Sequence, residues 1–183
     1  MTSSARQLGG PAFIYPPSTT NATIDLEPGN YALVCYIGSA REDRTRYHLL
    51  NGMFRALTVT PSSHARLASP RVDVVATIGE GNALTFSQPL RAGRMVIRVE
   101  NKTDKDLEFK FHRVPSGLTG KEFLAQPPGA GPGTPVGGLS SVPARASVIT
   151  TLDFTAGEYV VGTRPSIRHA TSQVVTVAFR KPQ

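Results

Sequence analysis

Apolar and polar residues alternate with a period of two along much of the chain. The clearest alternation lies at residues 72–78, 95–100 and 107–112, and each segment is bounded by glycine, asparagine or aspartate. Side chains two positions apart share one face of a strand, so the pattern predicts strands with one buried face. Several short strands separated by turn residues are typical of a β-sandwich.

One short helix is predicted at 119–126. Thr119 is a residue type that caps helix N-termini, and Pro127 and Pro128 follow the segment and end it. The residues from 127 to 138 are rich in glycine and proline, and we expect them to form a long loop.

The chain contains an internal repeat. When it is shifted by 128 positions, Gly9 aligns with Gly137 and Tyr31 with Tyr159, and residues 9–35 share six identities with residues 137–163. The match resumes after a gap, where residues 56–59 align with residues 174–177. A repeat of this kind predicts two copies of one structural unit.

The second copy also has a front half, residues 71–114, which has no counterpart before Gly9. We therefore expect the back half of one unit at 1–60, a linker at 61–70 and one complete unit at 71–183. The same comparison predicts about 60 further residues upstream of Met1.

Two parts of the chain resemble a known family. The run Leu90-Arg-Ala-Gly-Arg-Met-Val-Ile-Arg-Val-Glu-Asn-Lys-Thr, followed by Leu107-Glu-Phe-Lys-Phe-His, looks like the front half of a cupredoxin-like domain. Residues 26–35, with His48-Leu-Leu-Asn-Gly-Met downstream, look like the back half. The chain is similar to bacterial tandem cupredoxin-like proteins. The resemblance implies an all-β, antiparallel Greek-key β-sandwich in the periplasm or outside the cell, although no signal peptide is visible.

Full cupredoxins hold one copper ion with two histidines, one cysteine and a weak axial methionine. In the complete copy His112 matches the first histidine, but the cysteine position falls on Thr163, whose hydroxyl cannot supply a thiolate. His169 follows on the same segment, and Met95 lies on an earlier strand. The resemblance therefore implies a complete domain that has lost its blue copper site, with His112 as an ordinary histidine at a strand end.

In the partial copy, Cys35, His48 and Met53 have the identities and order of copper ligands. Thirteen positions separate Cys35 from His48, far more than in a blue copper loop, so the insert at 38–46 would have to fold out as a hairpin with its ends close together. The alternative hypothesis is a copper-binding electron-transfer or copper-handling protein that uses these three residues. Their ordinary roles would be a core thiol, a polar loop residue and a packing methionine.

A third arrangement would exchange halves between the copies. The front half of the complete copy would then bring His112 to Cys35, His48 and Met53 of the first copy. Pairing residues 71–114 with residues 139–180 needs no exchange, so the linear pairing is the one we expect.

An isolated half sandwich exposes a sheet edge and an apolar face. Three arrangements would bury them: an upstream half, packing on the complete domain, or pairing of two chains. We favour the upstream half, and self-association through the unpaired half-domain is the alternative.

Composition narrows the function classes. Hydrophobic residues make up 39% of the chain and charged residues 18%, which excludes a disordered protein. No apolar run is long enough to span a membrane. The net charge of +7 is scattered, and its densest cluster, at 41–46, contains two acids, so we expect no nucleic-acid partner. Salt-sensitive binding of anionic polymers is a further alternative.

No Ser-His-Asp order, paired-carboxylate motif or phosphate loop is present, so no catalytic residue is assigned and we expect no enzyme. The leading hypothesis is a non-catalytic cupredoxin-like binding or structural module without a cofactor. Its partner would be an unknown protein, recognised by the loops at 127–138 and 41–48, because loops on a rigid sandwich carry recognition.

Overall fold

The chain forms two compact units. The computed structural model describes residues 5–38, 47–61, 68–127, 131, 133–164 and 171–179. Unit 1 contains the residues up to Ile24 and those from Ser69 onward, and unit 2 is Asp25–Ala68. The expected division put all of residues 1–60 in one unit. The structure instead joins residues up to Ile24 to the complete copy, because they pair with its strands.

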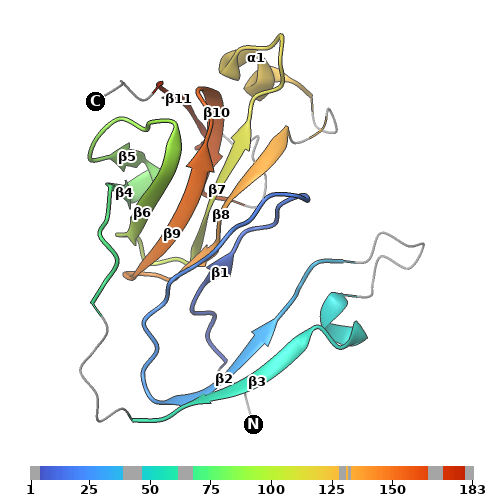
Figure 1. Cartoon of the computed structure of the whole chain (residues 1–183), viewed down its shortest axis with the longest axis vertical. Helices are drawn as coiled ribbons and strands as arrows, with labels where there is room; N and C mark the ends of the chain where they lie inside the picture. The colour runs from blue at the N-terminus through green and yellow to red at the C-terminus, as the bar shows by residue number, and fades with distance from the viewer. Residues whose placement is uncertain are drawn as a thin grey trace. The chain divides into compact units, whose positions relative to one another are not determined.

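Unit 1 is a sandwich of two sheets (Figure 1). The five-stranded sheet has the order β1-β8-β7-β10-β11, with β1 at Gly10–Pro11, β8 at Thr134–Val142, β7 at Leu107–Arg113, β10 at Gly157–Gly162 and β11 at Gln173–Val177. The four-stranded sheet has the order β5-β4-β6-β9, with β5 at Leu84–Phe86, β4 at Val74–Ile78, β6 at Gly93–Asn101 and β9 at Ser147–Phe154. The predicted all-β sandwich is confirmed.

The connections between the sheets follow a Greek key. Strand β6 pairs with β9 in one sheet, while β7 and β8, which lie between them in the chain, pair in the other. Most pairs are antiparallel as predicted, but β4 and β6 are parallel. The two halves of the complete copy therefore pair with each other, as the linear arrangement requires.

The core lies between the sheets. Alternate residues of β6 and β7 are buried, as the period-two pattern predicts. Phe109 and Phe111 are fully buried, and Phe111 packs edge-on against Phe154 with ring centroids 5.0 Å apart. Burial of each such ring contributes about 1.5–3 kcal/mol, so these aromatic side chains are a main source of stability of unit 1.

The predicted helix is present as α1, Gly120–Ala125. The Thr119 hydroxyl accepts a hydrogen bond from the backbone N–H of Glu122, and the Glu122 carboxylate accepts one from the Thr119 N–H, which makes a capping box. Phe123 packs with Val114 and Val160 on the outer face of the five-stranded sheet. A short 3-10 turn, η2, occupies Glu80–Asn82. In the described part of the chain, no helix has the length and hydropathy of a membrane span.

The expected loop at 127–138 is wrong over its last part, because β8 begins at Thr134. Gly137 and Gly138 pair with Phe111 and Lys110 of β7. Their φ angles are +132° and +127°, which only glycine adopts readily, and a Cβ at Gly138 would collide with the Phe109 carbonyl oxygen. A glycine-rich segment reads as a loop, although here it is glycine that allows two strands to approach closely.

Residues 5–24 of the partial copy pair with their own equivalents in the complete copy. Pro11 lies opposite Leu139, which is its counterpart in the repeat, and Thr23 bridges Ile149 through two backbone hydrogen bonds of 2.7 and 3.2 Å. The Asn21 side chain bonds the backbone of Thr151, the counterpart of Thr23. The pairing is reciprocal, because Thr23 bridges the counterpart of Asn21 and Asn21 bonds the counterpart of Thr23. This pairing covers edges of both sheets.

Unit 2 is a hairpin of β2, Gly29–Val34, and β3, Phe54–Val59, with the 3-10 turn η1 at His48–Asn51 (Figure 1). The alternating segment at 22–26 forms only the bridge at Thr23. The hairpin repeats the β10–β11 pair rung by rung: Tyr31 faces Leu57 as Tyr159 faces Val175.

A tyrosine bond also recurs in both copies. The Tyr31 hydroxyl donates to the carbonyl of Glu27 at 2.5 Å, and the Tyr159 hydroxyl donates to the carbonyl of Thr155 at 2.8 Å. Both tyrosines thus reach back four residues, as in the tyrosine corners of β-sandwiches. The repeat found in the sequence is therefore a repeat of strand register and of side-chain bonding.

Candidate functional site

The structure brings Cys35 and His48 together in unit 2. Cys35 follows β2, His48 begins η1, and the Cys35 Sγ lies 3.7 Å from the His48 Nδ1, within hydrogen-bonding distance for sulfur. Two backbone hydrogen bonds hold the start of η1 against the end of β2 and so keep the two side chains close. The Leu49 N–H donates to the Cys35 carbonyl, and the His48 N–H donates to the Ile37 carbonyl. Thirteen positions of separation are therefore compatible with a direct contact between the two side chains.

The two ends of the insert at 38–46 lie close together, as they must if the insert folds out as a hairpin. Gly38 and Tyr47 form an antiparallel bridge. Residues 39–46 lie outside the described residues, and with them the basic cluster at 41–46. Beside the bridge, the rings of Tyr36 and Tyr47 pack edge-on at 6.3 Å. This tyrosine pair was not predicted from the sequence.

Met53 shares the turn through its backbone. Its carbonyl accepts from the Cys35 N–H at 3.1 Å, and its N–H donates to the His48 carbonyl at 3.0 Å. Its side chain is 53% exposed. Across the described residues, no group of three or more His, Cys, Asp or Glu side chains converges as a metal site would require. The contact that the structure provides is therefore a thiol–imidazole pair.

His112 belongs to unit 1 and not to the hairpin. It lies on β7, half-buried, opposite Val160 of β10 and Pro135 of β8. Thr163 directly follows β10 and is 1% exposed. Its hydroxyl lies 3.5 Å from the hydroxyl of Thr171, and its carbonyl accepts from the Glu108 N–H. The position matched to a copper thiolate therefore holds a buried hydroxyl beside a second hydroxyl.

The thioether of Met95, in the complete domain, already has a hydrogen-bond partner. Met95 is 3% exposed, and its Sδ accepts a hydrogen bond from the Arg91 N–H at 3.2 Å. His169 lies outside the described residues. A trigonal His2Cys site needs a thiolate and a distant thioether. At the matched positions the structure holds the Thr163 hydroxyl and a Met95 thioether with a backbone partner.

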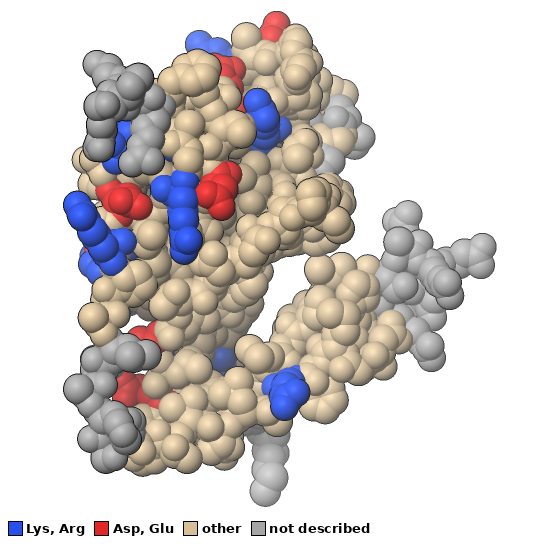
Figure 2. Space-filling model, in the orientation of Figure 1, with Lys and Arg blue, Asp and Glu red and all other residues tan. Residues whose placement is uncertain are grey.

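Charges of both signs are mixed on the surface. On the face shown in Figure 2, lysines and arginines lie among aspartates and glutamates, and no extended patch of one sign is seen there. Lys102 pairs with Glu100 at 2.7 Å, and Lys110 pairs with Glu108. Basic side chains that neighbouring acids neutralise give an anionic polymer little net charge to bind on this face.

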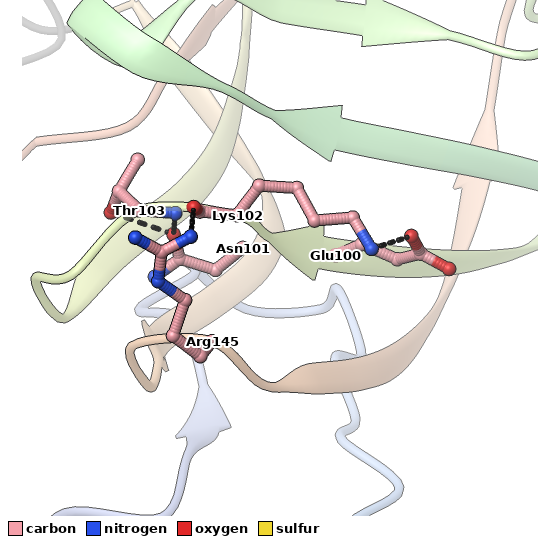
Figure 3. Close-up of polar contacts among 5 residues, drawn as sticks. All are labelled: Glu100, Asn101, Lys102, Thr103 and Arg145. Carbon is pink, nitrogen blue, oxygen red and sulfur yellow. Dashed lines mark hydrogen bonds and ion pairs between the residues drawn. The ribbon is translucent and has the colours of Figure 1, made fainter.

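The densest polar cluster of unit 1 is structural (Figure 3). The Asn101 side chain, 1% exposed, donates to the carbonyls of Lys105, Val142 and Pro143 at 2.7, 2.9 and 3.2 Å. Its Oδ1 accepts from the N–H and the hydroxyl of Thr103. One amide therefore ties the end of β6 to the end of β8, and its hydrogen bonds are internal to the fold.

Two sheets, a Greek-key connection and a final strand pair beside β7 define the arrangement of the complete copy. The architecture is cupredoxin-like. No family model and no curated protein matches the chain.

Two solved structures are similar to this chain. The multi-copper oxidase from Pediococcus acidilactici shares 14% identity at a TM-score of 0.32, over 69% of this chain and 31% of the other. The blue copper oxidase from Nitrosomonas europaea shares 12% identity at a TM-score of 0.32, over 85% of this chain and 57% of the other. The chain thus spans less than two thirds of either enzyme, and at these TM-scores we draw no conclusion from them about metal or activity.

Proposed function

We propose that the chain is a non-catalytic cupredoxin-like module that binds or organises another polypeptide, and that its complete domain has lost the blue copper site. The observation that carries the proposal is Thr163, a buried threonine at the position matched to the copper thiolate. A neutral hydroxyl is a poor ligand for the soft copper ion that a cysteine thiolate selects.

The neighbours of Thr163 support the same proposal. Its hydroxyl lies beside that of Thr171, and the thioether of Met95 accepts a backbone hydrogen bond. Polar atoms that already have partners inside a fold lose those partners when they bind a metal ion, which costs free energy. The resemblance to exported cupredoxin-like proteins supports a location outside the cytoplasm.

The exposed apolar surface of unit 2 supports a binding role. Side chains on and around the hairpin are more than half exposed, including Leu33, Tyr36, Leu50, Met53 and Phe54. Leu33 lies opposite Arg55 and Phe54 lies opposite Val34, so apolar side chains are exposed on both faces of the hairpin, as at an uncovered interaction site. The two loops expected from the sequence, at 127–138 and 41–48, lie in part outside the described residues.

A second candidate function is copper binding at Cys35, His48 and Met53. The 3.7 Å contact between the Cys35 Sγ and the His48 Nδ1 favours it, because a thiolate and an imidazole are ligands of blue copper sites. The Met53 thioether and a further histidine would complete such a site.

Copper loading separates the two functions. The purified chain is incubated with copper, desalted and analysed for metal content and visible absorption, beside the variants Cys35→Ser and His112→Asn. The proposal predicts substoichiometric copper and no intense thiolate-to-copper band in all three proteins. One retained copper per chain that disappears in Cys35→Ser would replace the proposal with the copper function.

A further inference from the structure

The hairpin of unit 2 lacks a strand that its counterpart has. In the complete copy, β10 lies between β11 and β7, with Val160 opposite His112 and Gly162 opposite Lys110. Among the described residues, β2 pairs with β3 alone. The strand pairs β2–β3 and β10–β11 share one register. Each residue on the outer edge of β2 can therefore be matched to the residue of β10 that faces β7.

Burial differs sharply between equivalent positions of the two copies. Val161 of β10 is fully buried, whereas Leu33, its equivalent on β2, is 61% exposed. Tyr159 is 1% exposed, while Tyr31 is only half-buried. Within the described residues of unit 2, no residue reaches the buried class. The strand β10 is thus buried in the core of the complete copy, whereas its equivalent, β2, is exposed.

The alternation of an antiparallel ladder identifies the amides on the free edge. Cys35 N–H donates to the Met53 carbonyl, so the odd residues of β2 direct their backbone groups toward β3. The N–H and C=O groups of Ala32 and Val34 therefore face away from β3. Their equivalents, Val160 and Gly162, are the residues of β10 that face β7.

Nothing in the sequence of β2 protects this edge. Gly29–Val34 contains no charged residue and no proline, the usual devices that keep an edge strand from pairing. An uncharged edge with exposed apolar side chains accepts an added strand through main-chain hydrogen bonds, and its pockets select alternate side chains.

We propose that the free edge of β2 binds an extended strand of another polypeptide, one that runs antiparallel to β2 and alternates large apolar with polar residues as β7 does. This inference rests on the proposed function and names its partner. The internal template is β7 itself, in which Phe109 and Phe111 are buried while Glu108 and Lys110 are only half-buried. The bound strand would pair with β2 in the same way as β7 pairs with β10 in the complete copy.

The test is a titration of the full chain with a labelled peptide that has the sequence of residues 105–114. A control peptide of the same composition carries its apolar residues in one block. We expect saturable binding of the first peptide only, with slowed amide exchange at Ala32 and Val34 and little change at Val160 and Gly162.

Proline variants give a matched pair on one rung. Ala32 lies directly opposite Ala56, and the backbone groups of the two point to opposite outer edges of the hairpin. Ala32→Pro should weaken peptide binding about tenfold or more, because it removes one amide and obstructs the edge. Ala56→Pro should leave the affinity within about twofold, since it alters only the outer edge of β3.

A peptide modification repeats the test without changing the protein. Val160 is the equivalent of Ala32, and it pairs with His112 of β7, so the bound peptide should place its His112 position opposite Ala32. The backbone groups of Phe111 face β8 instead. N-methylation at the position of His112 should abolish binding, and N-methylation at the position of Phe111 should be tolerated.

Any one of four results would overturn the inference, and the first three concern peptide binding and the free chain. They are equal binding of both peptides, binding that Ala32→Pro and the methylated peptide leave unchanged, and amides of Ala32 and Val34 that are already protected in the free dilute chain. Dimerisation of the wild type that Ala32→Pro removes would also overturn it, because the occupant would then be a second copy. Copper content is measured separately, so failure of peptide binding and failure of the copper-free proposal are distinguishable.

Discussion

Replacement of Asn101 by alanine should strongly destabilise unit 1. The Asn101 side chain donates to three carbonyls. It also accepts two hydrogen bonds from Thr103, which lies beside it in Figure 3. The carbonyls of Val142 and Pro143 are buried at these contacts, whereas the groups of Lys105 and Thr103 are partly exposed and can bind water after the substitution.

The magnitude follows from the buried partners. A buried polar group left without a hydrogen bond costs about 1–3 kcal/mol. Two such carbonyls give a loss of about 3 kcal/mol, a large part of the roughly 5–15 kcal/mol that stabilises a typical domain. At about 4 °C per kcal/mol for a domain of this size, the melting temperature should fall by about 12 °C.

Thermal and urea unfolding followed by circular dichroism measure the effect, with Lys102→Ala as the matched control. Lys102 is the next residue in the chain, and its 2.7 Å ion pair with Glu100 joins side chains that are 60% and 28% exposed. An exposed ion pair contributes about 0–1 kcal/mol, so the control should unfold close to wild type. An Asn101→Ala protein as stable as Lys102→Ala would refute the reasoning that this amide joins β6 to β8.

Two further predictions concern α1 and β8. Hydrogen bonds from the Thr119 backbone N–H and hydroxyl hold the pKa of Glu122 below its ordinary value of 4.5, so the capping box stabilises α1 above that pH and is lost as the pH falls through the lowered pKa. The protection factors of the α1 amides, taken relative to the intrinsic exchange rate at each pH, should fall on acidification, and Glu122→Gln should remove this pH dependence. An unchanged profile in the variant would exclude the capping box as its cause. Gly138→Ala should lower the free energy of urea unfolding by about 2–3 kcal/mol, because a Cβ there meets the Phe109 carbonyl and φ is positive. The control Gly81→Ala should lower it by only about 1–2 kcal/mol, because φ is +63° but a Cβ there meets open space. Equal losses in the two glycine variants would contradict the close approach of β7 and β8.

The sequence predicts those elements whose own residues determine them. Burial alternates along β7 and along β6 from Met95 onward, and both strands were predicted from period two alone. The helix α1 was predicted from Thr119 and the prolines that follow, because capping acts within a few residues. The repeat predicted which segments are equivalent, and the registers of β2–β3 and β10–β11 agree with that alignment.

Features that depend on contacts distant in the chain could not be predicted in this way. The start of β8 reads as a loop, since Gly137 and Gly138 form a strand only because β7 lies against them. Residues 5–24 appeared to belong with the hairpin, and only their pairing with β8 and β9 places them in unit 1. The contact between Cys35 and His48 depends on the bridge between Gly38 and Tyr47, which no local pattern encodes.

The assignment of the Thr163 position stays a prediction. It rests on the alignment of Thr163 with Cys35 in the repeat, and the copper measurement tests it. The role of Met53 also stays a prediction, because the structure joins it to the thiol–imidazole pair through backbone bonds.

Among the described residues, unit 2 is equivalent to the β10–β11 pair of a repeat unit, and no strand pairs with the outer edge of β2. Residue-resolved amide exchange of the dilute, peptide-free chain tests this claim most directly. We predict slow exchange at Val160 and Gly162, which face β7, and fast exchange at their equivalents Ala32 and Val34. Protection of Ala32 and Val34 comparable to that of Val160 and Gly162 would contradict the claim, because the edge of β2 would then already be covered.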